Sequence, residues 1–318
     1  MGETAEQLAA LARLVMPVAV TEPPSWVLAL VDGEPEDWVE QGRGLALRRF
    51  DSEQLSLVSA RVRGAVALGP DQLEELTRVA YGLIGTRLQR GNGAHAARIW
   101  NFIPGILAPL GELPHRYMAF NAGRYAAFEG WYEARDRFDR TVPTASGVGH
   151  DGEDLVIHCL AAASPGTPVE NPRQVPSYRY SKKYGPLPPC FARATLLELP
   201  AGRGCSLLVG GTASVRGEQS VHPADLEAQA AETFENLAAL VAAGLAARAG
   251  GAATATPRQV LLVRFRSLRV YYKREQDRER VSDLVAAAVP RVEEVELLHA
   301  DLCRAPLLVE IEGVAALD

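Results

Sequence analysis

Cysteine is scarce in this chain of 318 residues, and no run of apolar residues is long enough to cross a membrane. The four cysteines lie far apart without a Cys-x-x-Cys pair, so neither a disulfide framework nor a zinc knuckle is expected. The histidines are scattered too, with no His-Glu-x-x-His motif and no close pair. A transmembrane helix would need roughly 18 consecutive apolar residues. We therefore expect no metal, no cofactor and no membrane span.

A surplus of basic residues is also missing. The formal net charge is −6 and no long Lys/Arg block occurs, which argues against a nucleic-acid partner. The first residues include Glu3 and Glu6 and lack the basic start and apolar block of a secretory signal. The composition is that of an ordinary globular protein with enough apolar residues for one large or two medium domains. We expect a cytoplasmic protein, and a monomer.

The order strand, strand, helix, strand, helix, strand occurs twice along the chain. In each copy a Val-Arg-Gly tripeptide, at residues 62–64 and 215–217, precedes the first helix. The expected helices cover residues 70–91 and 117–135 in the first copy, then 224–249 and 275–289 in the second, with extended stretches at 97–103 and 260–273. This internal duplication predicts an α+β fold of two halves, each with helices packed on one face of a sheet.

The duplication divides the chain into an N-terminal half (1–163), a connecting segment (164–189) and a C-terminal half (190–318). The connecting segment is rich in proline and glycine, but tyrosines alternate with basic residues between positions 178 and 184. A segment this long without regular structure inside a compact protein usually carries function. We therefore expect it to contribute to a binding site.

Residues 307–311 are expected to form a strand, because they are aliphatic, contain Val309 and Ile311, and follow a proline. Successive side chains of a strand point to opposite faces, so Glu310 and Glu312 share one face. Two interpretations stay open. The strand could lie at a sheet edge with a solvated face, or a carboxyl group could be buried in a pocket as an acid.

Residues 147–152 match Gly-x-Gly-x-x-Gly, the pattern of dinucleotide-binding loops. That function requires a helix directly after the motif, whereas the next residues, 153–160, favour a strand. We interpret the motif as a hairpin-type turn and expect no nicotinamide cofactor.

Two arginines lie among apolar residues. Arg124 is next to aromatic residues in a helical stretch, and Arg193 lies in an apolar stretch expected to be a strand. Arg124 could lie on a solvated face, but an arginine among aromatic and small residues can also grip a carboxylate through two hydrogen bonds. Together the two suggest a site for an anion with more than one carboxylate.

Small residues at positions 210–214, Gly-Gly-Thr-Ala-Ser, end an apolar strand. They could allow backbone amides to approach a ligand closely, or they could form a tight bend at a sheet edge.

Five motifs in the same order resemble the chorismatase family, whose members release pyruvate from chorismate. They are residues 98–106 (RIWNFIPGI), 117–124 (YMAFNAGR), 180–194 (from YSKKYGP to FARA), 211–214 (GTAS) and 301–313 (from DLC to EIEG). The resemblance implies two halves that each look like the small RidA (chorismate-mutase-like) unit. It also implies an active site at the C-terminal half, with Glu310 as the acid and Glu312 as a supporting neighbour.

The resemblance further implies that Arg124 and Arg193 neutralise the two carboxylates of chorismate. Tyr184, Gly211, Thr212, Cys303 and Glu312 are expected to contact the substrate as well. Protonation of the enolpyruvyl methylene would make the ether bond labile, and an acid able to protonate carbon near pH 7 should be a carboxyl group whose pKa is raised by an apolar site.

Gly211 and Cys303 are the pair found in family members that form 3-hydroxybenzoate without net water, so this product is expected. Alternatives are a hydrolytic enzyme that forms a dihydroxycyclohexadiene carboxylate, and a synthase of mixed 3- and 4-hydroxybenzoate. Lys182-Lys183 and Lys273-Arg274 depart from the family pattern and leave room for an amino analogue of chorismate. A RidA-like protein that binds a small acid or deaminates imines is the alternative from another class.

Overall fold

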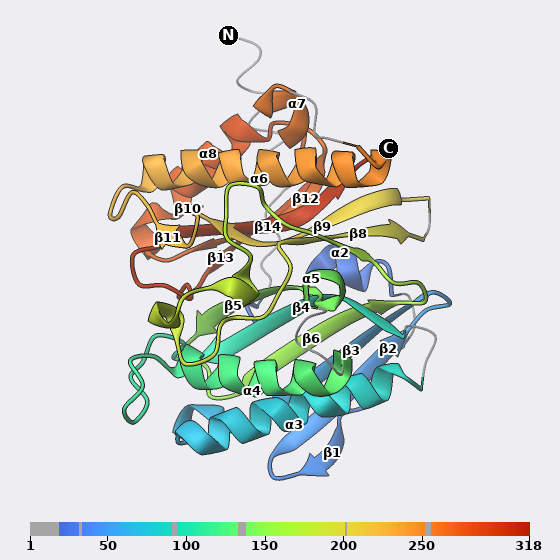
Figure 1. Ribbon diagram of the computed structural model, residues 1–318, viewed down its shortest axis with the longest axis vertical. Coiled ribbons are helices and arrows are strands. Elements are labelled where there is room, and N and C mark those ends of the chain that lie inside the picture. Colours follow the sequence, from blue (N-terminus) through green and yellow to red (C-terminus); the bar gives the residue numbers. More distant parts are fainter. Residues whose placement is uncertain (1–18, 32–33, 91–93, 133–137, 201, 252–255) are drawn as a thin grey trace.

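The computed structural model describes residues 19–31, 34–90, 94–132, 138–200, 202–251 and 256–318, so Glu3 and Glu6 lie outside the described residues. Two sheets face each other in the middle of the molecule, and helices cover the outer face of each (Figure 1). The expected α+β fold is confirmed.

Each half contains one six-stranded mixed sheet. The N-terminal sheet has the order β1-β2-β3-β6-β4-β5, with β1 (Val39–Gly42), β2 (Leu45–Asp51), β3 (Leu55–Val62), β4 (His95–Pro104), β5 (Thr144–His150) and β6 (Leu155–Ala162). The C-terminal sheet has the order β13-β12-β14-β9-β8-β7, with β7 (Thr167–Val169), β8 (Ala194–Leu199), β9 (Gly204–Ala213), β12 (Phe265–Tyr272), β13 (Glu294–His299) and β14 (Val309–Ala316). A separate two-stranded hairpin consists of β10 (Val215–Arg216) and β11 (Gln219–Ser220).

The longer helices pack on the outer faces of the two sheets, whereas the short helix at Ser25–Leu28 lies between the sheets with Trp26 and Val27 in the shared apolar layer. The N-terminal half has α3 (Pro70–Leu88), α4 (Arg116–Tyr132) and the short α2 (Ser25–Leu28) and α5 (Phe138–Thr141); the C-terminal half has α6 (Leu226–Ala249), α7 (Arg258–Leu262) and α8 (Arg278–Ala288). The α6 helix begins where Asp225 accepts a hydrogen bond from the backbone N–H of Ala228, 2.9 Å away. It ends at Gly250, which adopts the left-handed conformation that favours glycine.

The sheet topology confirms the internal duplication. The order β2-β3-β6-β4-β5 in one half is repeated as β8-β9-β14-β12-β13 in the other, and the last pair of strands is parallel in both. Both halves have a register shift at the equivalent strand pair, which is β6 and β4 in the N-terminal sheet and β14 and β12 in the C-terminal sheet. Counting from that shift places Val156 at the position of Glu310, and His158 at the position of Glu312. The two halves therefore share a sheet topology and register but differ in the side chains at equivalent positions.

Three apolar layers hold the molecule together. One lies between the N-terminal sheet and its helices, a second between the C-terminal sheet and its helices, and a third between the facing sheets. Since β6 and β14 are covered on both faces, they are aliphatic along most of their length. Whether residues 1–163 and 190–318 are separate domains stays a prediction; β7, which lies in the connecting segment, pairs with β8 of the C-terminal sheet.

Several expected elements differ in detail. Residues 260–262 belong to the helix α7, not to a strand, because Pro257 precedes a helical turn that packs on α6. The loop after residue 150 is not a hairpin turn, since β4 lies between β5 and β6. Strand β9 continues through Gly210 and Gly211 to Ala213. The expected helix ends at Gly91 and Arg135 lie outside the described residues.

Candidate active site

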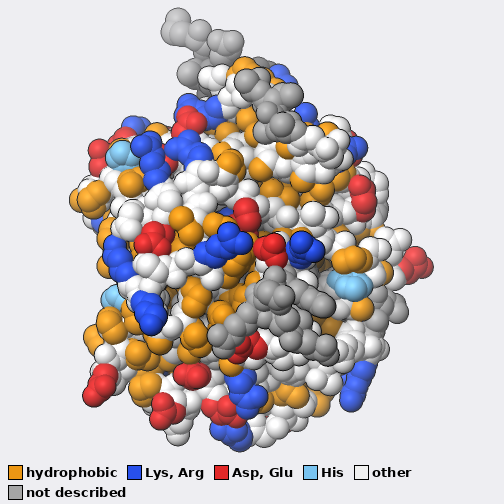
Figure 2. All heavy atoms as spheres, in the orientation of Figure 1, with side chains coloured by type: hydrophobic (Ala, Val, Ile, Leu, Met, Phe, Trp, Pro, Cys, Tyr) orange, Lys and Arg blue, Asp and Glu red, His pale blue; other side chains and the backbone are white. Residues whose placement is uncertain are grey.

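A cavity of about 410 Å³ lies between the halves, where β5 faces β9 and β14. Its charged lining side chains are Glu310, Arg193, Arg304 and Lys183. Its aromatic lining side chains are Tyr117, Tyr180, Tyr184 and Phe191. Figure 2 shows hydrophobic side chains gathered on this face across the two halves, with basic side chains beside them at mid-height. A concave, largely apolar cavity with a few converging charges is the usual form of a small-molecule site.

Glu310 brings a carboxyl group to this cavity from the middle of a sheet. Strand β14 lies between β12 and β9, so the interpretation of an edge strand with a solvated face is wrong. The side chain is only 4% exposed, and no described residue forms a hydrogen bond or an ion pair with it. Burial and the neighbouring charge of Glu312 raise the pKa of Glu310 to about 8, although Arg98, Arg193 and Arg304 act in the opposite direction.

Glu312 shares a strand face with Glu310, as expected, but it does not line the cavity. Both of its oxygens accept hydrogen bonds. Oε2 accepts from Arg98 and from Ser146, each at 2.6 Å. Oε1 accepts from the indole N–H of Trp100 at 2.7 Å and from the hydroxyl of Tyr271 at 3.2 Å. We call these four donors the Glu312 clamp.

A bulge in β9 creates the space for the Glu310 carboxyl group. Two residues, Gly210 and Gly211, lie opposite the single residue Glu312 of β14. A Cβ atom on Gly211 would lie 1.9 Å from Oε1 of Glu310 and 3.2 Å from the Cβ of Ser146. Any side chain at position 211 would therefore displace the Glu310 carboxyl group.

The cavity is lined by two guanidinium groups, the buried Arg193 and the half-buried Arg304, and the sequence did not single out the second. Arg193 directly precedes β8 and donates to the hydroxyl of Tyr180. Arg304 lies over the ring of Tyr184, 4.2 Å from its centroid, and donates to the carbonyl of Glu218 at 2.7 Å. The signal that could have found Arg304 is its place beside Cys303 in the last motif.

Arg124 is completely buried and is not among the residues that line the cavity. It donates to Asn121 at 2.8 Å and lies 5.7 Å from the ring centroid of Phe191, which does line the cavity. The alternative of a solvated face is wrong. Its Nε and Nη1 have no hydrogen-bond partner in the described part of the chain. The structure thus places Arg124 one layer behind the wall, and its role in substrate binding stays a prediction.

The other expected contact residues divide in the same way. Cys303 and Tyr184 line the cavity. Burial and then the charge of Glu310 raise the pKa of the Cys303 thiol to about 12, so the thiol is neutral near pH 7. Thr212 is buried, donates to the carbonyl of Gly210 at 2.9 Å and does not line the cavity.

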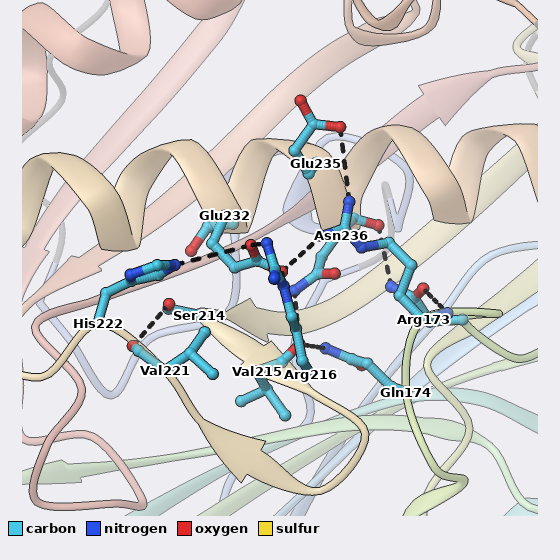
Figure 3. Close-up of polar contacts among 12 residues, drawn as sticks. Arg173, Gln174, Ser214, Val215, Arg216, Val221, His222, Glu232, Glu235 and Asn236 are labelled. Atoms are coloured by element: carbon cyan, nitrogen blue, oxygen red, sulfur yellow. Dashed lines mark hydrogen bonds and ion pairs between the residues drawn. The ribbon is translucent and has the colours of Figure 1, made fainter.

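The connecting segment and the β10–β11 hairpin form one wall of the cavity, and Glu232 of α6 anchors both (Figure 3). Glu232 is 3% exposed and accepts from Arg173 at 2.6 Å and from Arg216 at 2.7 Å. Arg173 belongs to the connecting segment, and Arg216 to the hairpin. A second tie is the hydrogen bond from the backbone N–H of Gly217 to the carbonyl of Arg173, at 2.9 Å.

The related position in the N-terminal half has no acid. His158 replaces the clamped glutamate there; burial lowers its pKa to about 3, and its Nε2 donates to the carbonyl of Thr21. Segment 20–31 covers this region, with Ser25 donating to Glu296 of β13 and Trp26 packing edge-on against Trp100. Among the described residues, the carboxyl group that lines the cavity therefore comes from the C-terminal half, from its last strand.

Comparison with known proteins agrees with this geometry. The family model described as chorismatase FkbO/Hyg5-like, N-terminal, matches residues 36–161. A 3-hydroxybenzoate synthase of Streptomyces hygroscopicus is 38% identical over 243 residues, which are 76% of this chain and 69% of that protein. The chain belongs to the chorismatase family.

Two further relatives support the same family assignment. A chorismatase of Streptomyces rapamycinicus is 35% identical over 221 residues, 69% of this chain and 64% of that protein. A chorismatase crystal structure superposes with a TM-score of 0.74 and 28% identity, over 89% of this chain and 80% of that one. The family expected from the five motifs is confirmed.

The described residues contain neither a membrane-spanning helix nor a group of metal-binding side chains. None of their helices is long and apolar enough to pass through a bilayer. Their His, Cys, Asp and Glu side chains form no group that could hold a metal ion.

Proposed function

We propose that this chorismatase converts chorismate to 3-hydroxybenzoate and pyruvate. The observation that carries the proposal is the position of Glu310, a buried carboxyl group that lines the cavity without a hydrogen-bond partner among the described residues; burial raises its pKa to about 8, which favours the acid form. The name of the 38% identical relative, a 3-hydroxybenzoate synthase, supports the product. A monomeric state and a cytoplasmic location stay predictions from the sequence.

The cavity fits a small dianion. Chorismate has a ring carboxylate and an enolpyruvyl carboxylate, and the lining offers the guanidinium groups of Arg193 and Arg304. Each can form paired hydrogen bonds to a planar carboxylate. Lys183, whose Nζ lies 2.7 Å from the side-chain oxygen of Gln219, adds a positive charge at the same wall. These groups would orient the vinyl ether toward Glu310.

The reaction begins when Glu310 donates its proton to the methylene carbon of the enolpyruvyl group. The electron pair of the C=C bond forms the new C–H bond, and positive charge develops on the ether carbon and oxygen. The bond from the ring to the ether oxygen then breaks, and its electron pair becomes part of the keto group of pyruvate. A carboxylate is left on Glu310, beside the arginines that stabilise it.

The oxygen of the neighbouring ring hydroxyl group bonds to the ring carbon that loses pyruvate and gives its proton to the Glu310 carboxylate, which leaves an epoxide across the two carbons. The bond from this oxygen to its original carbon then breaks. Loss of the proton from the carbon that keeps the oxygen restores the aromatic ring, and the oxygen takes up a proton to become the 3-hydroxyl group. No net water enters the products. Gly211 and Cys303 lie beside this acid and match the residue pair expected for this outcome. A hydrolytic outcome and a mixture of hydroxybenzoates are the alternatives.

Replacement of Glu310 by glutamine tests the proposal. Glutamine keeps the size of the side chain but cannot act as a carboxylic acid, and loss of a general acid costs about 10²–10⁴-fold in rate. We expect wild-type protein to release pyruvate from chorismate, measured with lactate dehydrogenase, and 3-hydroxybenzoate, measured by chromatography. Glu310→Gln should lose at least about 10²-fold in kcat while still binding chorismate.

Glu279→Gln is the matched control, because Glu279 is exposed on α8 and does not line the cavity. Its rate should equal that of the wild type. Near wild-type turnover by Glu310→Gln would refute the role of Glu310. Absence of pyruvate from the wild-type reaction would instead favour a RidA-like protein that binds small acids.

A further inference from the structure

We propose that Glu312 is a positioning residue whose clamped carboxylate keeps Glu310 protonated, so that the acid is ready before substrate binds. This inference rests on the proposed function in one respect, the role of Glu310 as the acid. It assigns to Glu312 an electrostatic task in place of the substrate contact expected from the sequence.

Glu312 is held as a carboxylate by its hydrogen-bond donors. Its two oxygens accept four hydrogen bonds, one of them from the guanidinium group of Arg98 at 2.6 Å. Both side chains of this ion pair are 2% exposed. A buried carboxylate is stable only with such partners, and protonation would oppose the donors that already point at it. The clamp therefore fixes the negative charge on Glu312.

Glu310, in contrast to Glu312, is buried without hydrogen-bond donors in the described part of the chain. It lies two residues away on the same strand face, about 7 Å along the strand by ordinary β geometry. No described residue donates a hydrogen bond to it, and it is 4% exposed. When two carboxylates share a site of low polarity, the proton goes to the one without donors.

Several other charged and titratable groups surround Glu310 and affect its pKa. Arg98 of β4 is already paired with Glu312. Arg193 and Arg304 reach the cavity from the chain before β8 and from the loop before β14, and both lower the pKa of Glu310. Burial raises the pKa of Cys303 and of Tyr117 to about 12, and it raises the pKa of Tyr271, which lies opposite Glu310 on β12, well above its ordinary value, so all three are neutral near pH 7. Lys183 adds a further positive charge to the cavity lining.

Substrate binding should strengthen this arrangement. The carboxylates of a bound dianion would neutralise Arg193 and Arg304, the positive charges that oppose protonation of Glu310. The like charge of Glu312 would remain, since Glu312 is outside the cavity lining. The proton would therefore be held most firmly when the substrate is in place.

The clamp joins the two halves of the molecule. Arg98 and Trp100 lie on β4, and Ser146 lies on β5, whereas Glu312 lies on β14. Three of the four donors thus come from the N-terminal half, across the contact between the sheets.

The test is the pH dependence of kcat/KM for Glu312→Gln, compared with the wild type and with Glu312→Asp. In the wild type kcat/KM should fall as Glu310 loses its proton. Without the charge of Glu312, the midpoint should move down by about one pH unit, which lowers kcat/KM about tenfold at pH 9 and leaves it within a few-fold at pH 6. Glu312→Asp, which keeps the charge, should keep the midpoint.

A merely structural role for Glu312 would lower activity equally at all pH values, and that result or an unchanged midpoint in Glu312→Gln would overturn the inference. Infrared difference spectra against Glu310→Gln give a second measurement that needs no turnover and no folded Glu312 variant. Wild-type protein at pH 7 should show the C=O band of a protonated carboxyl group that is absent from Glu310→Gln. Absence of that band from the wild type overturns the inference, whereas its presence without chorismate turnover overturns only the proposed function.

Discussion

At the scale of single residues, two identical side chains on one strand face adopt opposite chemical states. Glu312 accepts four hydrogen bonds, while Glu310 has no such partner among the described residues and a pKa of about 8. The difference comes from what the facing sheet offers to each. The sequence predicted the shared face, because the alternation of a strand is a local property, whereas Glu310 was expected to be the acid from the resemblance to the chorismatase family.

The residues around this pair were only partly predictable. Gly211, Cys303 and Arg193 line the cavity as the motifs implied. Arg98 was part of a matching motif, but its contact with Glu312 joins positions 214 residues apart. No local pattern signals a contact made by two sheets that pack face to face.

Product choice can be tested at two residues. An alanine at position 211 would push the Glu310 carboxyl group aside, since its Cβ would lie 1.9 Å from Oε1. An alanine in place of Cys303 would widen the space beside the ring. We expect the double variant Gly211→Ala/Cys303→Ala to divert flux from 3-hydroxybenzoate to the hydrated diene, and kcat to fall by up to about 10²-fold because the acid is misplaced.

Chromatography of the products separates these outcomes. Cys303→Ser, which nearly preserves the size of the side chain, is the control and should keep 3-hydroxybenzoate as the main product. The same product ratio in the double variant and in the wild type would contradict the assignment of positions 211 and 303.

At the scale of elements, the site depends on irregular features. The bulge in β9 makes room for the Glu310 carboxyl group, and segment 164–193 forms a wall of the cavity with little regular structure. The sequence predicted α6 and α8 to within a few residues, because their apolar spacing and capping residues are local, but it missed the short helices α2, α5 and α7. It did not predict the bulge, which depends on the register between two strands.

Glu232 tests whether the wall must be fixed in place. Glu232→Gln removes the charge that holds Arg173 of the connecting segment and Arg216 of the hairpin. Because charge-assisted hydrogen bonds are the stronger ones, we expect a looser wall and a KM for chorismate about tenfold higher, with kcat within a few-fold.

Steady-state kinetics check this prediction. Glu235→Gln is the matched control, because Glu235 lies on the same helix and also pairs with Arg173, at 3.5 Å, but is far more exposed. It should change KM less than twofold. An unchanged KM in Glu232→Gln would mean that the wall keeps its place without this anchor.

At the scale of the whole molecule, the sheet topology is duplicated, but the candidate acid Glu310 occurs in the C-terminal half alone among the described residues. The two sheets repeat the same topology, yet Val156 and His158 stand where the C-terminal half has Glu310 and Glu312. The N-terminal half instead supplies most of the clamp and part of the cavity. The duplication was readable from the order of elements, but the face-to-face packing that unites the halves was not.

The most direct test of the central claim is a proton NMR spectrum of the products formed from chorismate in D₂O. Protonation of the enolpyruvyl methylene by Glu310, whose proton exchanges with solvent, predicts pyruvate with a single deuterium in its methyl group together with 3-hydroxybenzoate. Pyruvate without that deuterium, or a hydrated diene in place of the aromatic acid, would contradict it.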